Sequence, residues 1–275
     1  MAQTMQGEER PLPVVAPLGL DRWRRAWSSK LPPILTAVTI IIVWQLAIDL
    51  LSVPIYIAPA PSLVIKEFVT QFPLLISNLL PTLFEAICGF VLGNLTAVMV
   101  AVALVHSRLA ERCFYPLAVF LHSIPMLALA PILVLIFGTG QAPKIVIAAL
   151  LCFFPMLVNM VRGLNAVSPQ ALELMRVLSA SRSEIFWKLR IQSSLPFLFS
   201  ALRVTAPACV IGAIVGEWIG SAVGLGALIL EATYNFRSPL LYATIFLSSG
   251  MAITLFSLVA AAEKRVIRWK AGAID

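Results

Sequence analysis

Six stretches of this 275-residue sequence are apolar and long enough to cross a lipid bilayer as helices. They cover about Pro33–Leu51, Leu80–Val105, Cys113–Phe137, Lys144–Val161, Pro196–Gly216 and Leu240–Ala262. Hydrophobic residues make up 60% of the chain and charged residues 12%, whereas soluble proteins are about 25% charged. The sequence therefore predicts an all-α polytopic membrane protein with six transmembrane helices. Polar tails at residues 1–32 and 263–275 would flank a transmembrane domain at residues 33–262.

The basic residues are distributed very unevenly between the loops that join these stretches. If the amino terminus is cytoplasmic, the outer loops contain only Lys66, Lys144 and Arg237, and Arg203 falls within the fifth stretch. All other Lys and Arg residues lie in the cytoplasmic segments, as the positive-inside rule requires. The expected location is the bacterial inner membrane, with both termini in the cytoplasm. Because the basic residues are scattered among loops, the net charge of +7 does not indicate nucleic-acid binding.

The third stretch contains Pro125 and Pro131, each of which removes a backbone hydrogen bond from a helix. Backbone groups freed in this way are tolerated at membrane depth only where protein or water covers them. This stretch is therefore expected to face the interior of the helix bundle. Pro125, Met126 and Pro131 are candidates for the lining of a translocation pathway.

A charged segment, Ser168–Arg203, interrupts the apolar pattern and predicts two short amphipathic helices. In the first, Ser168 is expected to cap the helix, and apolar side chains then recur at helical spacing. In the second, Ser181 and Glu184 have the spacing of a capping box and precede Phe186. A cytoplasmic helical hairpin at about Ser168–Gln192 in a membrane protein suggests contact with a soluble partner. Met175 and Phe186 could instead lie on lipid.

The motifs and residue clusters of common enzyme classes are not visible in the sequence. No Gly-x-x-x-x-Gly-Lys-Ser/Thr loop is present, so ATP cannot be bound in the usual way. His106 and His122 are isolated, and the four cysteines lack the spacing of a metal site. We expect no catalytic residues, metal or cofactor on this chain. Secondary transporters show paired repeats and several midplane charges, and membrane enzymes show clustered His, Asp or Glu; neither pattern is visible.

Ionisable residues within apolar stretches are functional candidates because burying them is costly. Glu85 lies one turn inside the second stretch and could also reach the outer interface or pair locally. Glu217 ends the fifth stretch beside Trp218 and a glycine-rich segment. Glu217 and Trp218 are candidates for the pathway or an outer gate, with a structural role for Glu217 preferred over solute contact. Asp49 is expected to lie at the membrane interface.

The Ser168–Arg203 segment resembles the EAA loop of permease subunits of binding-protein-dependent ABC importers. Glu173-Leu174-Met175 corresponds to the first triplet of that pattern, Ser179 to its Gly, Phe186 to its aromatic residue and Ile191-Gln192 to its Leu-Pro. Leu195-Pro196 follows as a second Leu-Pro. Three further segments, Ile57–Val64, Ser123–Gly140 and Gly216–Ile229, resemble the nitrate, sulfonate and taurine branch of these permeases.

This resemblance implies a type I importer permease that transports solute by alternating access. It implies two copies of an ATP-binding subunit, which hold ATP and Mg, an extracytoplasmic substrate-binding protein, and a homodimer of this chain surrounded by membrane lipid. The residues implied to couple to the ATPase are Glu173, Leu174, Met175, Leu178, Ser179, Ala180, Ser181, Glu184 and Phe186. The solute implied is a sulfonate, taurine, nitrate or related small anion. Related permeases transport thiamine precursors or aromatic compounds, which remain the alternative.

Overall fold

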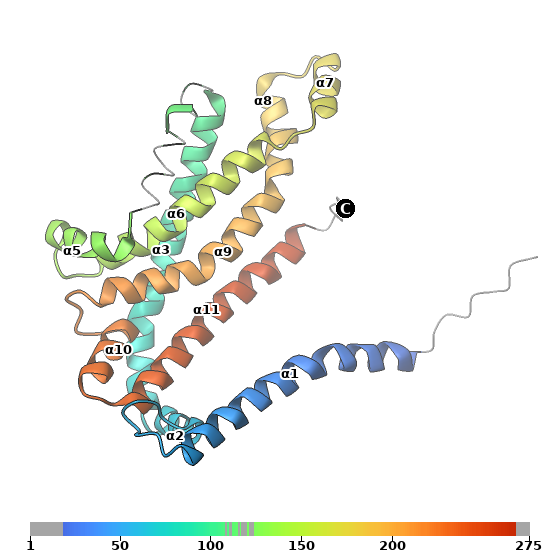
Figure 1. Ribbon diagram of the computed structural model, residues 1–275. Coiled ribbons are helices and arrows are strands. Elements are labelled where there is room, and N and C mark those ends of the chain that lie inside the picture. Colours follow the sequence, from blue (N-terminus) through green and yellow to red (C-terminus); the bar gives the residue numbers. More distant parts are fainter. Residues whose placement is uncertain are drawn as a thin grey trace, which may run out of the picture. The chain divides into compact units, whose positions relative to one another are not determined.

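The structure, a computed structural model, describes residues 19–107, 109, 112–114, 116, 120 and 124–267. Every regular element in these residues is a helix (Figure 1), which confirms the all-α prediction. The chain divides into two compact units, Met1–Val53 and Pro54–Asp275. The first contains α1 (Gly19–Leu50), whose segment Leu31–Leu50 is apolar and long enough to cross a membrane.

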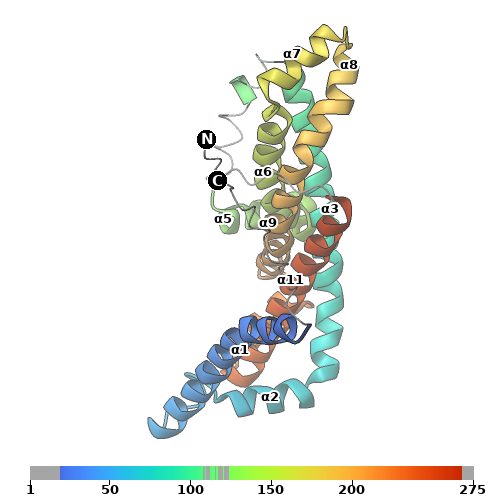
Figure 2. The same cartoon turned by 90° about the vertical axis from the view of Figure 1, so that its right-hand side faces the viewer.

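The second unit is built from long oblique helices and several short ones. Its elements are α2 (Pro61–Thr70), α3 (Phe72–His106), α5 (Met126–Phe137), α6 (Ala142–Asn165), α7 (Pro169–Val177), α8 (Arg182–Ile185), a π-helix (Phe186–Arg190), α9 (Ile191–Glu217), α10 (Leu225–Tyr234) and α11 (Ser238–Val266). Figures 1 and 2 show α7 and α8 at one end of α6 and α9. Figure 1 shows α10 at the opposite end of α9.

Five helices in the described residues have the length and hydropathy of membrane spans, and they correspond to five of the six predicted stretches. The predicted third span, Cys113–Phe137, is represented by the 12-residue helix α5 at its carboxyl end. Most of that stretch before α5 lies outside the described residues. Pro125 is the N-cap residue of α5 and Pro131 lies inside the helix, so α5 begins directly after the first of the two prolines.

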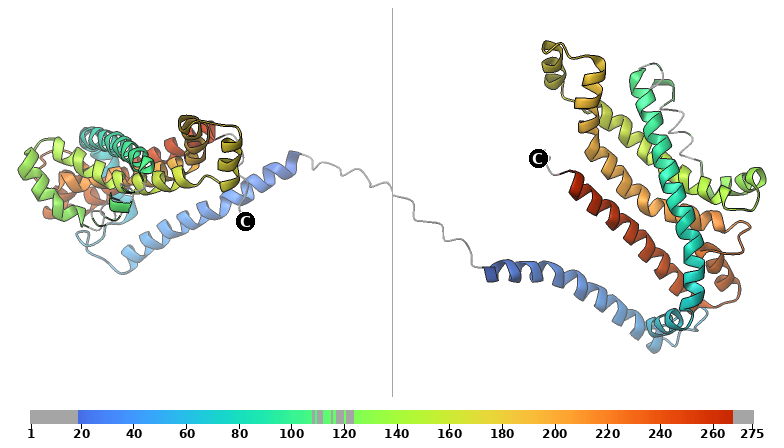
Figure 3. Two further views of the ribbon diagram at one scale, coloured as in Figure 1. Left: turned by 90° about the horizontal axis from the view of Figure 1, so that it is seen from above. Right: turned by 180° about the vertical axis from the view of Figure 1, so that it is seen from behind.

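Helix α6 packs against both α3 and α9, and small residues bring these backbones close together (Figure 3). Gly89 and Gly93 of α3 contact α6 so closely that a β-carbon at either position would clash with Ala148 or Ala149. Gly212 and Gly216 of α9 also lie close to α6, where a β-carbon would clash with Ala148 or Lys144. Both glycine pairs have the small-xxx-small spacing that favours close packing of transmembrane helices. The spacing is visible in the sequence, but our sequence analysis did not use it.

The interior of this three-helix layer contains two clusters of buried apolar side chains. The cluster nearer α7 and α8 includes Leu104 of α3 and Leu157 and Leu164 of α6. The cluster nearer α10 consists of smaller residues and includes Cys152 and Cys209. Because tight helix crossings need small side chains, the second cluster lies where the glycines bring α6 closest to its neighbours.

Polar side chains also connect helices that are far apart in the sequence. The Thr205 hydroxyl of α9 donates to Asn94 Oδ1 of α3 at 3.1 Å, and both residues are buried. Arg203 of α9 forms an ion pair with Glu263 of α11. Arg237, just before α11, pairs with Glu67 of α2 at 3.0 Å. The Thr205–Asn94 bond gives each of two buried polar groups a partner, and the two ion pairs are partly exposed.

Candidate functional site

The hairpin formed by α7 and α8 is the first candidate site, and its start is fixed by a local cap. Ser168 is the N-cap of α7, and its hydroxyl oxygen accepts a hydrogen bond from the Ala171 amide at 3.3 Å. Pro169 follows at the first helical position, where an N–H group would have no helical partner. The Ser168 cap was predicted from the sequence and is confirmed.

The turn between the two helices ends α7 with Ser179 in a left-handed conformation, at φ 55°. The Ser179 amide bonds to the Arg176 carbonyl and the Ala180 amide to the Met175 carbonyl, each at 2.9 Å. These two bonds form the Schellman motif, which usually places Gly at this position. Ser179 therefore adopts a left-handed geometry that is strained for a residue with a β-carbon.

Helix α8 begins with the predicted capping box. The Ser181 amide donates to the Glu184 carboxylate at 2.9 Å, and the Glu184 amide donates to the Ser181 hydroxyl at 3.2 Å. Glu184 also pairs with Lys188 one turn later at 3.0 Å, with both side chains exposed. Ser181 and Glu184, which were predicted to contact an ATPase, thus have a local role in fixing where α8 starts.

Phe186 lies at the junction between the hairpin and the transmembrane helices. It begins a five-residue π-helix that joins α8 to α9 without a break. Its half-buried ring contacts His106 at the end of α3, with 5.0 Å between ring centroids. The ring also packs on the apolar cluster nearer α7 and α8. The Trp187 ring packs edge-on against the Phe186 ring, with 5.4 Å between the ring centroids. Phe186 therefore anchors the hairpin to α3, a contact through His106 that sequence analysis did not identify.

One side of the hairpin is apolar and exposed. Leu174 is 60% exposed, Val177 82% and Leu178 66%, and the charged side chain of Glu173 lies beside them. We refer to Glu173, Leu174, Val177 and Leu178 as the exposed hairpin face. Met175 and Ala180 are half-buried, so the predicted coupling residues divide into an exposed group and a supporting group. Apolar side chains grouped on a short polar hairpin are typical of a contact surface for another protein.

The five pathway candidates lie on two elements. Pro125, Met126 and Pro131 belong to α5 or its cap, and the exposed side chains Leu135 and Ile136 lie further along this helix. Glu217 and Trp218 end α9. Trp218 is 37% exposed, whereas Glu217 is 1% exposed.

The Glu217 carboxylate accepts hydrogen bonds on both oxygens. The Thr82 hydroxyl of α3 donates to Oε1 at 2.6 Å, and the Gly226 amide of α10 donates to Oε2 at 2.5 Å. The Leu225 amide donates to Thr82 Oγ1 and the Gly224 amide to Asn78 Oδ1, both at 2.8 Å. Sequence analysis missed Asn78 and Thr82, although their four-residue spacing places them on one face of α3.

Glu85 continues this polar face of α3 and is fully buried. It forms an ion pair with Lys144 of α6 at 3.1 Å, and Lys144 also donates to the Ser221 hydroxyl at 2.7 Å. Glu85 therefore does not reach the outer interface, and the alternative interpretation, that it pairs with a nearby group, is confirmed. Lys144, which the charge pattern assigned to the outer side, is buried at the start of α6. Buried opposite charges compensate each other here, because either alone would be costly in an apolar layer.

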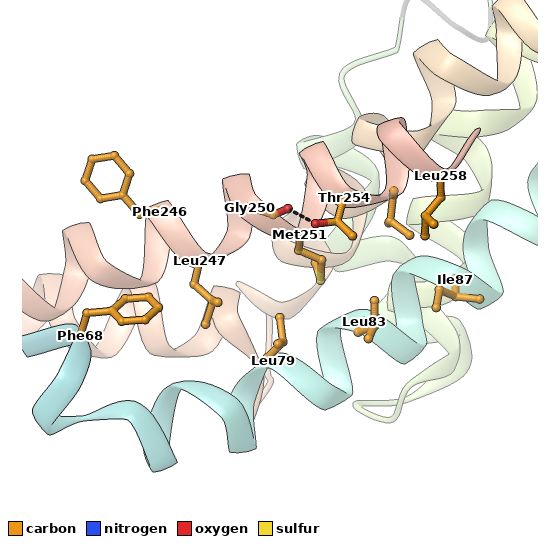
Figure 4. Close-up of a pocket in the computed structure, with 11 residues that line it drawn as sticks. Phe68, Leu79, Leu83, Ile87, Phe246, Leu247, Gly250, Met251, Thr254 and Leu258 are labelled. Atoms are coloured by element: carbon orange, nitrogen blue, oxygen red, sulfur yellow. Dashed lines mark hydrogen bonds between the residues drawn. The ribbon is translucent and has the colours of Figure 1, made fainter. Parts of the chain in front are cut away.

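A separate apolar groove of about 590 Å³ lies between α11 and the α2–α3 region (Figure 4). Its lining includes Phe68, Leu83 and Met251. The hydroxyl of Thr254, which also lines it, donates to the Gly250 carbonyl of the same helix at 2.7 Å. The groove therefore offers a charged solute no partner, and its chemistry fits apolar chains or side chains.

Comparison with known proteins was made for both the sequence and the structure. The family described as "Binding-protein-dependent transport system inner membrane component" matches residues 89–268. The formylaminopyrimidine transport permease ThiX of Halalkalibacterium halodurans is 32% identical over 90% of this chain and 98% of the relative. The riboflavin transport permease RibX of Chloroflexus aurantiacus is 31% identical over 96% of this chain and 99% of the relative. A putative aliphatic sulfonates permease, SsuC of Bacillus subtilis, is 27% identical over 90% of each chain.

Among solved structures, the fold is similar to that of an inward-facing MetNI methionine ABC transporter. The TM-score is 0.61, and the alignment covers 72% of this chain and 97% of that chain at 20% sequence identity. At this identity the likeness concerns the fold alone.

Proposed function

Because this chain belongs to the family of inner membrane components of binding-protein-dependent transport systems, we propose that it forms the solute pathway of an ATP-driven importer. Family membership makes it a multi-pass transport subunit of the inner membrane. It also implies an ATP-binding subunit and a substrate-binding protein as partners. ATP and Mg would be held by the ATP-binding subunit, and two copies of that subunit would serve two copies of this chain.

The observation that supports a coupling role is the exposed hairpin face. Leu174, Val177 and Leu178 project from a hairpin whose helices are capped and whose base is anchored through Phe186. A partner bound to this face would move the hairpin, and the continuous helix from α8 to α9 would transmit that movement to the transmembrane core. ATP-driven closure of two such partners would turn the pathway outward, and hydrolysis would return it inward.

Co-purification tests this role directly. The chain would be expressed with the ATP-binding subunit encoded beside it, and the double variant Leu174→Asp/Leu178→Asp compared with Val223→Asp. Val223 is 54% exposed but lies near α10, at the other end of the unit. We expect the double variant to lose the ATP-binding subunit and the Val223 variant to retain it. Retention by both variants would contradict the proposal.

The transported solute is proposed from the relatives and from sequence resemblance. Sequence resemblance favours a sulfonate, taurine, nitrate or similar anion, and SsuC supports that class. The greater identity to ThiX and RibX favours the alternative, a heteroaromatic compound such as a thiamine precursor or a flavin. Binding measurements on the partner substrate-binding protein with taurine, nitrate, formylaminopyrimidine and riboflavin separate the two classes. The family match provides no support for a secondary transporter.

A further inference from the structure

Helix α10 begins without a cap from its own segment. Its N-cap residue is Gly224, at φ 114°, which provides no side chain. The first amides of a helix have no partner within the helix and need acceptors from elsewhere. Leu225 and Gly226, at the start of α10, are buried, so water is not a ready substitute.

Three side chains from two other helices supply these acceptors. The amides of Gly224, Leu225 and Gly226 donate to Asn78, Thr82 and Glu217, respectively, at 2.5 to 2.8 Å. We refer to Asn78, Thr82 and Glu217 as the α10 socket. The Glu217 side chain places an acceptor oxygen at the start of the helix, as the side chain of a local N-cap residue does. The amides of these three residues at the start of α10 are thus capped by α3 and α9.

The glycines of α10 and a second contact restrict this arrangement further. A β-carbon at Gly224 or Gly226 would clash with the Glu217 carboxylate, so both positions require glycine while the socket is formed. Earlier in the same connection, Ser221 accepts a hydrogen bond from Lys144, which is paired with Glu85. The segment between α9 and α10 is therefore held at two points by buried polar groups of α3, α6 and α9.

We infer that Glu217 is a positioning residue, which holds α10 against α3 and α9 so that these three elements move as one rigid body during transport. Its side chain is 1% exposed and both oxygens accept hydrogen bonds within the chain, so it is not accessible to a solute in this arrangement. The outer opening of the pathway must then form at contacts other than those between α10 and its socket. This inference goes beyond the proposed function, because the socket exists without any partner.

Hydrogen–deuterium exchange of the chain in lipid nanodiscs tests the socket. We expect Glu217→Ala to raise exchange of the first α10 turn about tenfold or more, since an acceptor is removed from a buried amide. Exchange in α6 should not change. Glu217→Gln should exchange like the parent protein. Its amide oxygen still accepts from Gly226, its NH₂ group can donate to Thr82, and the Thr82 hydroxyl can donate to the Asn78 carbonyl at 3.1 Å.

Two threonines provide a matched pair of variants in which Glu217 itself is not substituted. Thr82→Val removes a socket acceptor and should also speed exchange of the first α10 turn. Thr233→Val makes the same change later in α10, where the hydroxyl bonds only locally to the Ile229 carbonyl, and should leave that turn unchanged. The socket is refuted if Glu217→Ala or Thr82→Val leaves the first turn protected. It is also refuted if Glu217→Gln exchanges as fast as Glu217→Ala.

The rigid-body part of the inference is tested in the complex with the ATP-binding subunit. Exchange of the first α10 turn would be measured without nucleotide and after trapping with ATP and vanadate. We expect equal protection in both states. Faster exchange in either state would show that α10 leaves its socket during the cycle. Failure to bind the ATP-binding subunit would contradict the proposed function but leave the nanodisc measurements unaffected.

Discussion

At the scale of single residues, the candidate coupling residues separate into those that build the hairpin and those that it presents. Ser168, Ser181 and Glu184 cap its helices, and Phe186 attaches it to α3 and the core. Glu173 has no such local role and lies exposed beside the apolar side chains. Substitutions at the first group should therefore act through hairpin structure, and substitutions at Glu173 through partner binding.

Glu173→Lys should weaken binding of the ATP-binding subunit and uncouple transport from ATP hydrolysis, while insertion and folding remain normal. Reversing a charge at a protein interface is expected to cost at least about 1.4 kcal/mol, a tenfold loss of affinity. Affinity would be measured between the detergent-solubilised permease and the ATP-binding subunit. Glu231→Lys, an equally exposed reversal on α10, is the matched control and should have no effect. Equal affinities for both variants would show that Glu173 is not in the interface.

Ser179→Gly should stabilise the turn, because Ser179 occupies a left-handed conformation at φ 55° that costs a non-glycine residue about 1 kcal/mol. Exchange of the Ser179 and Ala180 amides should slow by about fivefold. Ser183→Gly, inside α8, should instead destabilise its helix, because the Ser183 backbone is helical and glycine is unfavourable there. Faster exchange in Ser179→Gly would indicate a stabilising contact of the Ser179 hydroxyl.

At the scale of elements, tight packing of α6 against α3 and α9 determines the architecture. The glycine pairs Gly89/Gly93 and Gly212/Gly216 leave no space for a β-carbon against α6. In a bilayer, moving an apolar side chain from the lipid acyl chains into a helix interface gains little free energy. Close backbone packing is therefore a main source of helix association. The buried pairs Glu85–Lys144 and Asn94–Thr205 add specific contacts to the same three helices.

Gly212→Ala should destabilise the protein by about 1–3 kcal/mol, because the added methyl group would push α9 away from the α6 backbone. Thermal unfolding in detergent, followed by loss of the monodisperse peak, measures this loss. Gly250→Ala in α11 is the matched control, since a β-carbon there meets no atom within 4 Å. If both variants unfold at the same temperature, packing of α6 against Gly212 is not limiting for stability.

The sequence predicted the elements better than their contacts. Apolar length identified five described spans, and cap spacing located Ser168 and the Ser181–Glu184 box, because these signals are local in the chain. Helix α10 was missed, since its cap comes from Asn78, Thr82 and Glu217 rather than from neighbouring residues. The ion pair between Lys144 and Glu85 was also not predicted, because the two residues are distant in sequence.

At the scale of the whole molecule, the hairpin and α10 lie at opposite ends of α9, and the charge pattern assigns the hairpin to the cytoplasm. The proposed topology therefore places the exposed hairpin face toward an ATP-binding subunit and α10 toward the outside. The apolar groove between α3 and α11 has no charged lining, so the proposed passage for a polar solute lies elsewhere.

Cysteine labelling tests this topology in a background without the four native cysteines. In intact cells, a membrane-impermeant thiol reagent should modify Tyr234→Cys, which is 77% exposed on α10, and should leave Ser181→Cys unmodified. After the membrane is permeabilised, both should react. Labelling of Ser181→Cys in intact cells would reverse the proposed orientation.

Site-specific photo-crosslinking of the intact complex tests the central claim, that the exposed hairpin face binds the ATP-binding subunit. A photoreactive amino acid would be placed at Val177, which is 82% exposed, and separately at Tyr234 as a comparably exposed control. The account predicts a crosslink to the ATP-binding subunit from position 177 and none from position 234. A crosslink from position 234, or none from position 177 in a complex that still hydrolyses ATP, would contradict it.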